Sequence, residues 1–235
     1  MGIWKKLFGI KETSKYTNMP KGEVVPASGS VSDIHKAADA GDVDAQVNLG
    51  MLYSQGIGVQ KDLSKAMQWY RKAADQGNAE ARCNIGALFA EGLGVSRNPV
   101  TAIGWYRKAA EQGYARAMYN LGAMYGKGEG ASRDYAEAEK WIRMAAEAGF
   151  SGAQYQLGIM FLKGVGVKQD ALEAARWLRD AADGGEVEAQ YNLGLMLAVG
   201  EGMEQDLGAA KVALRKASEQ GHAQALNTLR KLEGL

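Results

Sequence analysis

The stretch from Asp42 to Gly77, DVDAQVNLGMLYSQGIGVQKDLSKAMQWYRKAADQG, recurs down the chain at a fixed interval of 36 residues. A glycine occupies the same place in each copy, at Gly50, Gly86, Gly122, Gly158 and Gly194. A tryptophan recurs at the same interval, at Trp69, Trp105, Trp141 and Trp177. A period of about 20 to 50 residues is typical of proteins built from stacked repeats. The sequence therefore predicts one continuous solenoid, although a length of 235 residues alone allows one or two compact domains.

Each copy reads as two helices separated by a turn. In the first copy, one apolar stripe at helical spacing is formed by Ala45, Leu49, Leu52 and Tyr53. A second stripe follows, formed by Ala66, Trp69, Tyr70 and Ala73. Paired glycines, which end helices readily, lie between the two stripes in all five copies, beginning with Gly56 and Gly58. We therefore predict an all-α fold of twelve helices and no strand, made of 36-residue helix-turn-helix repeats with buried tryptophans.

The start of each second helix is marked by a residue whose side chain can cap it. These N-cap residues are Asp62, Asn98, Asp134, Asp170 and Asp206. Pro99 follows Asn98 at the first helical position, where its missing N–H does no harm. Glu137 and Glu173 stand three residues after an aspartate, and we predict that they complete capping boxes.

The sequence outside the five copies divides into three parts. Residues 1–30 show no repeat and read as an N-terminal segment followed by a linker rich in Pro, Gly and Ser. Residues 31–41 match the second half of a copy and are predicted to cap the first repeat. Full repeats then occupy 42–77, 78–113, 114–149, 150–185 and 186–221, and residues 222–235 are predicted to form a capping helix. The repeat domain therefore covers residues 31–235.

The N-terminal segment is amphipathic. Its apolar side chains on one side of a helical wheel include Ile3, Trp4, Leu7 and Phe8. Residues 1–30 hold five lysines and two glutamates, so their net charge is 5 − 2 = +3. The segment is predicted either to anchor the protein to a membrane surface or partner, or to fold onto the first repeat, and the sequence leaves both interpretations open.

Composition and charge argue against several classes of protein. A net charge of +1 argues against general attraction to nucleic acid. A single cysteine cannot form an internal disulfide, so nothing indicates an oxidising compartment. No apolar run approaches the roughly 18 residues of a membrane-spanning helix. We therefore expect a cytoplasmic protein, peripheral to a membrane if the N-terminal segment is an anchor.

The sequence holds no recognisable catalytic or metal-binding motif. Its two histidines, His35 and His222, stand at opposite ends of the repeats. Cys83 has no evident base near it and is expected to be a buried or groove-lining small side chain. We therefore expect no enzyme activity, no metal and no cofactor.

An arginine recurs in the second helix of every copy, at Arg71, Arg107, Arg143, Arg179 and Arg215. This column alone suggests a track for phosphate groups. An acid stands four residues after each arginine, at Asp75, Glu111, Glu147, Asp183 and Glu219. Because that spacing places both charges on one helix face, we predict ion pairs within each helix rather than a basic stripe.

The residues of the first copy resemble the Sel-one-like repeat family, a branch of the tetratricopeptide repeat superfamily. The family pattern is matched by Ala45, Leu49, Gly50, Tyr53, Gly56, Gly58, Val59, Ala66, Trp69, Tyr70, Ala73, Ala74 and Gly77. The resemblance covers residues 31–235, with departures in the fifth copy, where Leu197 replaces the tyrosine and Ala213 the tryptophan. It implies a right-handed α/α superhelix that binds other proteins as an adaptor or scaffold, and it brings no catalytic residue.

In this superfamily the first helices line the concave side of the superhelix. One column there holds the tyrosines Tyr119, Tyr155 and Tyr191, and the next includes Ile159 and Leu195. Basic side chains near them are Arg116, Lys127 and Lys163. Because tyrosine combines a large contact area with a hydroxyl, we predict an aromatic strip with a basic edge that binds a peptide or helix of a partner protein. The other interpretation is that the tyrosines only fill space between first helices.

Three functions follow from these patterns. The leading hypothesis is an adaptor or scaffold that holds a partner polypeptide in the concave groove, tethered by the N-terminal segment. A more specific form is an inhibitor or immunity protein for one cognate enzyme. An enzyme acting on a cell-wall or glycan substrate would need a convergent acid, base or nucleophile, and the sequence shows none.

Overall fold

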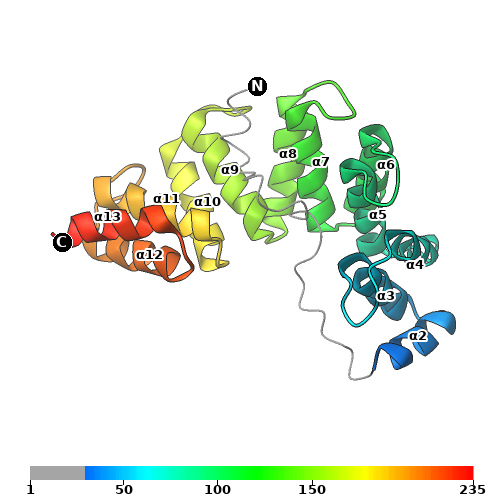
Figure 1. The fold of residues 1–235 in the computed structure, drawn as a ribbon. Coiled ribbons are helices and arrows are strands. Elements are labelled where there is room, and N and C mark those ends of the chain that lie inside the picture. The colour runs from blue at the N-terminus through cyan, green and yellow to red at the C-terminus, as the bar shows by residue number, and fades with distance from the viewer. Residues whose placement is uncertain (1–29, 235) are drawn as a thin grey trace. The chain divides into compact units, whose positions relative to one another are not determined.

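The structure is a computed structural model in which residues 30–234 are described. Over these residues the chain forms twelve α-helices and no strand, which confirms the predicted fold class (Figure 1). The helices are α2 (Val31–Asp39), α3 (Val43–Gln55), α4 (Leu63–Asp75), α5 (Ala79–Glu91), α6 (Pro99–Ala110), α7 (Ala115–Lys127), α8 (Tyr135–Glu147), α9 (Ser151–Lys163), α10 (Ala171–Asp183), α11 (Val187–Val199), α12 (Leu207–Glu219) and α13 (Ala223–Glu233). The pairs from α3–α4 to α11–α12 are the five repeats.

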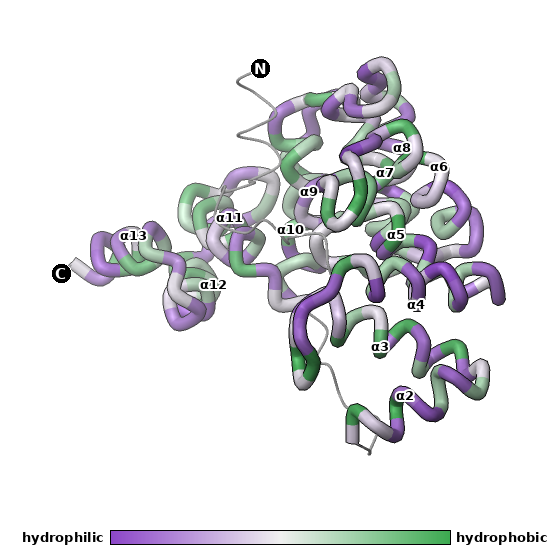
Figure 2. The backbone as a smooth tube through the Cα atoms, turned by 45° about the vertical axis from the view of Figure 1, so that its right-hand side comes forward, coloured by the Kyte–Doolittle hydropathy of each residue, from purple (hydrophilic) through white to green (hydrophobic). Residues whose placement is uncertain are grey.

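The described helices belong to two compact units, α2 to α7 in residues 30–133 and α8 to α13 in residues 134–234. Within each unit, every helix packs against the next one in the chain. Hydrophobic and hydrophilic residues alternate along each helix (Figure 2). Each unit is therefore stacked as a solenoid, in which a helix contacts its sequence neighbours.

The predicted caps hold the second helices. The side chains of Asp62, Asn98, Asp134, Asp170 and Asp206 each accept a hydrogen bond from a backbone N–H of the helix that follows. The predicted capping boxes are wrong: Glu137 accepts from the indole N–H of Trp141 at 3.0 Å, and Glu173 from Arg176 at 2.7 Å. A capping box occurs instead at Ser30 and Asp33, before α2.

In four of the repeats, the two helices meet at one close contact. The side chains one position after the tryptophan column are almost fully buried, at Tyr70, Tyr106, Ile142, Leu178 and Leu214. Within each unit, these side chains pack on the glycine column, at Gly50, Gly86, Gly158 and Gly194. A Cβ atom built on Gly86 would lie 2.7 Å from Cδ1 of Tyr106, and one on Gly158 would lie 2.8 Å from Cγ of Leu178. Glycine is therefore required there because a methyl group would occupy the space of the facing side chain.

The tryptophans lie at the edge of this interior. Trp69 is buried, but Trp105, Trp141 and Trp177 are partly exposed, so the prediction of buried tryptophans is wrong for three of the four. Lysine ammonium groups lie over the rings, as at Trp69, where Nζ of Lys72 is 3.8 Å from the ring centre. One step along a helix turns the side chain by about 100°, so the residue after each tryptophan, rather than the tryptophan, points at the first helix.

Three arginines of the column contact the next helix rather than the acid four residues later. The contacts reach the residue eighteen positions on, in the pairs Arg107–Tyr125, Arg143–Phe161 and Arg215–Glu233. Where an acid of the same helix is used, it comes earlier: Nε of Arg143 donates to Glu139 at 2.6 Å. The predicted pairs with Glu147 and Glu219 are therefore wrong, because the guanidinium side chains reach across to the neighbouring first helix.

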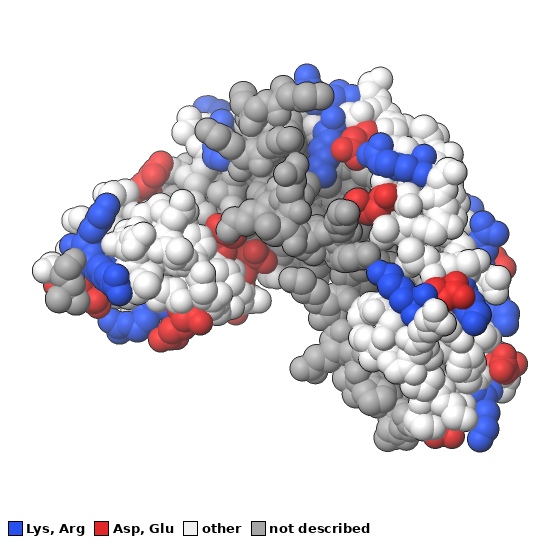
Figure 3. Space-filling model, viewed as in Figure 1, with Lys and Arg blue, Asp and Glu red and all other residues white. Residues whose placement is uncertain are grey.

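Charged side chains are mixed on the described surface. In the view of Figure 3, basic and acidic residues are interspersed over both units. None of the helices in residues 30–234 has the length and apolar character needed to cross a membrane.

Candidate functional site

The candidate binding surface is carried by the first helix of each repeat, and we name it the first-helix face. In residues 30–133 it belongs to α3, α5 and α7, and in residues 134–234 to α9 and α11. The predicted site residues fall on these helices: Arg116, Tyr119 and Lys127 on α7, Tyr155, Ile159 and Lys163 on α9, and Tyr191 and Leu195 on α11. Each group is described within its own unit.

The clearest feature of the first-helix face is the guanidinium of Arg116. Its Nη2 lies 2.8 Å from the hydroxyl of Tyr114, 3.1 Å from Oδ1 of Asn84 and 3.5 Å from a carboxylate oxygen of Glu80. The side chain is only 16% exposed. Two of these partners come from α5, so Arg116 ties the first helices of two successive repeats together and is held in one orientation.

Buried polar groups continue beneath Arg116. Nδ2 of Asn120 donates to Sγ of Cys83 at 3.7 Å, and both residues are buried. Nε of Arg116 and Nδ2 of Asn84 are buried donors without a hydrogen-bond partner among residues 30–234. An unsatisfied buried donor costs roughly 1–3 kcal/mol, so this cluster is held at a cost in stability.

The environment sets the protonation of this cluster. Burial raises the pKa of the Cys83 thiol to about 11, although Arg116 opposes the shift. Burial likewise raises the pKa of the Tyr114 hydroxyl to about 12. Burial lowers the pKa of Arg116, but Cys83, Tyr114 and Glu80 together raise it further, so the net shift is upward. At neutral pH the cluster therefore presents a fixed cation beside a protonated, unreactive thiol.

The second unit uses one predicted tyrosine for packing. The ring of Tyr191 stacks on His222, with ring centres 4.4 Å apart, and packs on the cluster that joins α12 to α13. Nε2 of His222 lies 3.2 Å from the carboxylate of Glu188, and its Nδ1 accepts from the N–H of Ala225 at 3.0 Å. Tyr191 thus packs against the start of α13.

The other predicted residues differ in exposure. Ile159 is 4% exposed and belongs to the interior. Tyr119, Tyr155, Leu195 and Lys127 are partly exposed, and Lys163 is exposed. The apolar side chains predicted to anchor the N-terminal segment, at Ile3, Trp4, Leu7 and Phe8, lie outside the described residues.

The sequence interpretation missed four members of the Arg116 cluster: Glu80, Asn84, Tyr114 and Asn120. Asn84 and Asn120 occupy a column of carboxamide residues that is nearly constant between copies, so nothing in the column itself marks these two as different from the others. Tyr114 precedes its helix, outside the helical stripe. Within residues 30–234, no group of three or more His, Cys, Asp or Glu side chains is placed to hold a metal ion.

The described helices define an α-helical repeat protein assembled from helix-turn-helix units. Residues 43–78, 79–114, 115–150, 151–186 and 187–222 each match the family model of the Sel1 repeat. These matches cover more than half of the sequence, and the chain belongs to the Sel1 repeat family. Repeats of this family typically mediate protein–protein interactions and are generally not catalytic. A comparison with curated proteins gave no match.

Solved structures share the fold. A Sel1 repeat protein from Oxalobacter formigenes is 36% identical with a TM-score of 0.82, over 86% of this chain and 59% of that one. A protective antigen with an SLR fold from uropathogenic Escherichia coli is 32% identical with a TM-score of 0.52, over 87% of this chain and 51% of that one. This chain thus spans only 59% and 51% of their lengths. An immunity protein from Pseudomonas aeruginosa has a TM-score of 0.58 at 23% identity, over 82% of this chain and 73% of that one, which shows a common fold.

Proposed function

We propose that the protein is an adaptor or scaffold that binds a partner polypeptide on its first-helix face. Membership of a family whose repeats typically mediate protein–protein contacts supports this function. The observation that carries it is the guanidinium of Arg116, which is fixed by Tyr114, Asn84 and Glu80 while its side chain stays 16% exposed.

A fixed arginine suits the recognition of acceptor groups on a polypeptide. Its guanidinium can donate up to five hydrogen bonds in a planar arrangement that matches a carboxylate. Because Arg116 is already ordered, little side-chain freedom is lost when a partner binds. Partly exposed Tyr119 lies one turn along α7 and offers an aromatic contact next to the cation. The partner segment would therefore carry an acidic side chain or chain end close to an apolar residue.

The test is affinity capture of the partner by the full chain, followed by calorimetry with purified variants. Arg116→Ala and Tyr119→Ala should each weaken binding by at least tenfold if they are hot spots. Lys72→Ala is the matched control, since Lys72 lies over Trp69 on the second helix α4. Full affinity in correctly folded Arg116 and Tyr119 variants would place the binding surface elsewhere.

The narrower form of this function is inhibition of one cognate enzyme. The fold is shared with two immunity proteins from Pseudomonas aeruginosa, but at 23% identity that likeness concerns the fold alone. The captured partner decides between the two forms: an inhibitor would bind an enzyme and lower its activity at a one-to-one ratio, and a scaffold would leave the partner active. The N-terminal segment is proposed as a tether for either form.

A further inference from the structure

A contact recurs where successive repeats meet. A residue of one second helix reaches the residue eighteen positions later, on the next first helix. The contacts are His35 to Tyr53, where Nε2 and the hydroxyl are 3.0 Å apart, Arg107 to Tyr125, Arg143 to the ring of Phe161, and Arg215 to Glu233. In three of these four junctions the second partner is an aromatic ring.

A tryptophan of the second helix completes the first of these junctions. The ring of Trp69 stands edge-on to that of His35, with centres 6.0 Å apart, and the ring of Tyr53 stands edge-on to His35 at 5.8 Å. Three large side chains therefore fill the junction between α2, α3 and α4.

The junction in the fifth repeat lacks both aromatic rings. Four periods of 36 residues after His35, Tyr53 and Trp69, the chain has Arg179, Leu197 and Ala213. Arg179 is exposed and makes no hydrogen bond or ion pair with another residue of the range 30–234. The leucine at position 197 is smaller than the tyrosine at the equivalent position of the first repeat.

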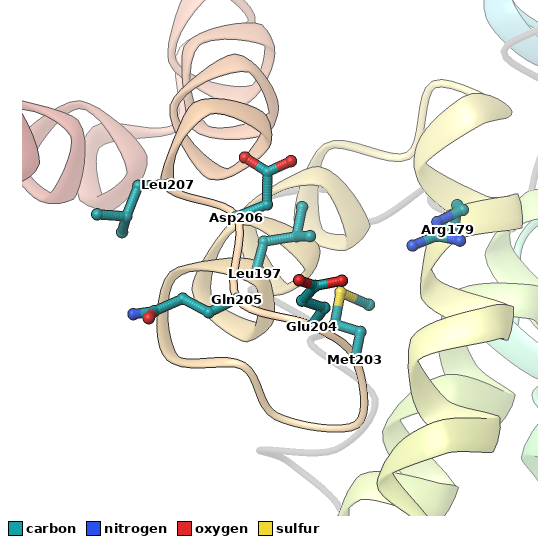
Figure 4. A pocket seen from close by; sticks show the side chains of 7 residues that line it. All are labelled: Arg179, Leu197, Met203, Glu204, Gln205, Asp206 and Leu207. Atoms are coloured by element: carbon teal, nitrogen blue, oxygen red, sulfur yellow. The ribbon is translucent and has the colours of Figure 1, made fainter.

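A cavity of about 640 Å³ lies at this place, and its lining includes Arg179, Leu197, Met203, Glu204, Asp206 and Leu207 (Figure 4). Arg179 extends from α10, and the other residues belong to α11, the following loop and the start of α12 (Figure 4). The equivalent cavity of the first repeat is smaller, about 390 Å³, and Tyr53 lines it. The cavity is thus larger where Leu197 stands in place of the tyrosine.

The lining fits an aromatic ring in three ways. The guanidinium of Arg179 can lie over a ring, as that of Arg143 lies 5.6 Å from the ring centre of Phe161. Leu197, Leu207 and the thioether of Met203 supply apolar and sulfur contacts. Glu204, which also has no hydrogen-bond or ion-pair partner in the described range, can accept an indole N–H, as Glu137 does from Trp141.

We propose that this cavity is a binding site for an aromatic side chain, above all tryptophan, presented by a partner polypeptide. The ring of the occupant lies beside Leu197, where the first repeat has the ring of Tyr53 in the cavity wall. The site is formed by α10, α11, the start of α12 and the loop that connects α11 to α12. It is independent of the function proposed for the first-helix face.

The test uses the full chain with N-acetyl-L-tryptophanamide as the probe. The Met203 methyl signal, assigned through Met203→Leu, should shift saturably in the NMR spectrum as the ring enters the cavity. Arg179→Ala should weaken binding about fivefold, the loss of one cation–π contact at an exposed site. Arg215→Ala is the matched control and should bind normally, because Arg215 is paired with Glu233. N-acetyl-L-leucinamide should bind at least fivefold more weakly than the tryptophan probe.

Restoring the missing ring in the cavity wall gives the decisive variant. Leu197→Tyr should reduce probe binding more than tenfold, and Leu197→Phe should do the same if the tyrosine disturbs folding. The proposal would be overturned if a correctly folded variant with a ring at position 197 bound the probe as well as the wild type does. Equal binding of the leucine and tryptophan probes would also overturn it. Binding that occurs only after Trp4→Ala would assign the cavity to the chain's own N-terminal tryptophan and would also overturn it.

Discussion

Replacing Gly86 by alanine should destabilise the protein by about 2 kcal/mol, although alanine normally favours a helix. The new Cβ atom would lie 2.7 Å from Cδ1 and 2.8 Å from Cε1 of Tyr106. The ring cannot move aside easily because Tyr106 is 1% exposed. Overpacking of this kind costs about 3 kcal/mol at the upper end of its usual range, and the better helix propensity of alanine offsets about 1 kcal/mol.

Gly104 provides a matched control in the same repeat. It lies in α6, is exposed, and a Cβ atom there would meet nothing within 4 Å. Gly104→Ala should therefore stabilise the protein by up to about 1 kcal/mol through helix propensity alone. Urea unfolding of the full chain at 25 °C, followed by circular dichroism, should separate the two variants by about 3 kcal/mol with similar m-values.

A double variant isolates the contact between the two side chains. Tyr106→Ala alone should cost about 3–5 kcal/mol, the usual loss for a large buried aromatic. In that background Gly86→Ala should cost nothing further, because the atoms it would meet are gone. If Gly86→Ala stabilises the wild-type protein as Gly104→Ala does, the close packing of α5 on α6 is not what requires glycine.

Three further predictions concern other parts of the chain. Burial raises the pKa of Cys83 to about 11, against about 8.5 for an exposed thiol. The unfolded chain therefore loses this proton at a lower pH than the folded protein does, so the free energy of unfolding should fall as pH rises between these two pKa values. Cys83→Ala should reduce that fall in urea melts between pH 8 and pH 10.5, and equal slopes would contradict it. Trp141→Ala should cost about 2 kcal/mol in thermal or urea melts, less than Tyr106→Ala, because the indole is partly exposed; an equal loss would mean that the indole belongs to the interior. Deletion of residues 1–20 should leave the helical content per residue unchanged, as measured by circular dichroism. It should weaken association with anionic vesicles or with the captured partner. Unfolding of the first repeat in this variant would instead identify the segment as a structural cap.

The candidate site was only partly accessible from the sequence. The 36-residue repeat placed Arg116, Tyr119 and Tyr155 on first helices, as the structure confirms. Helical spacing then fixes which residues share a face. It did not reveal that Tyr191 stacks on His222 or that Ile159 is buried, since both depend on the helix packed alongside. The partners of Arg116 were missed for the same reason: Glu80 and Asn84 lie 36 and 32 residues away in the chain.

The sequence by itself determined the features that act within one or two turns of a helix. The 36-residue period, the Asp62-type caps and the glycine stops, such as Gly56 with φ of 78°, define where each helix begins and ends. Only the tertiary structure decided what the side chains meet across helices. It shows that the residue after each tryptophan fills the core, that Arg107, Arg143 and Arg215 contact the next helix, and that Leu197 lines a cavity beside Arg179. Local patterns fix a helix and its faces, but a contact between helices depends on the distance and rotation of two separate backbones, which no local pattern specifies.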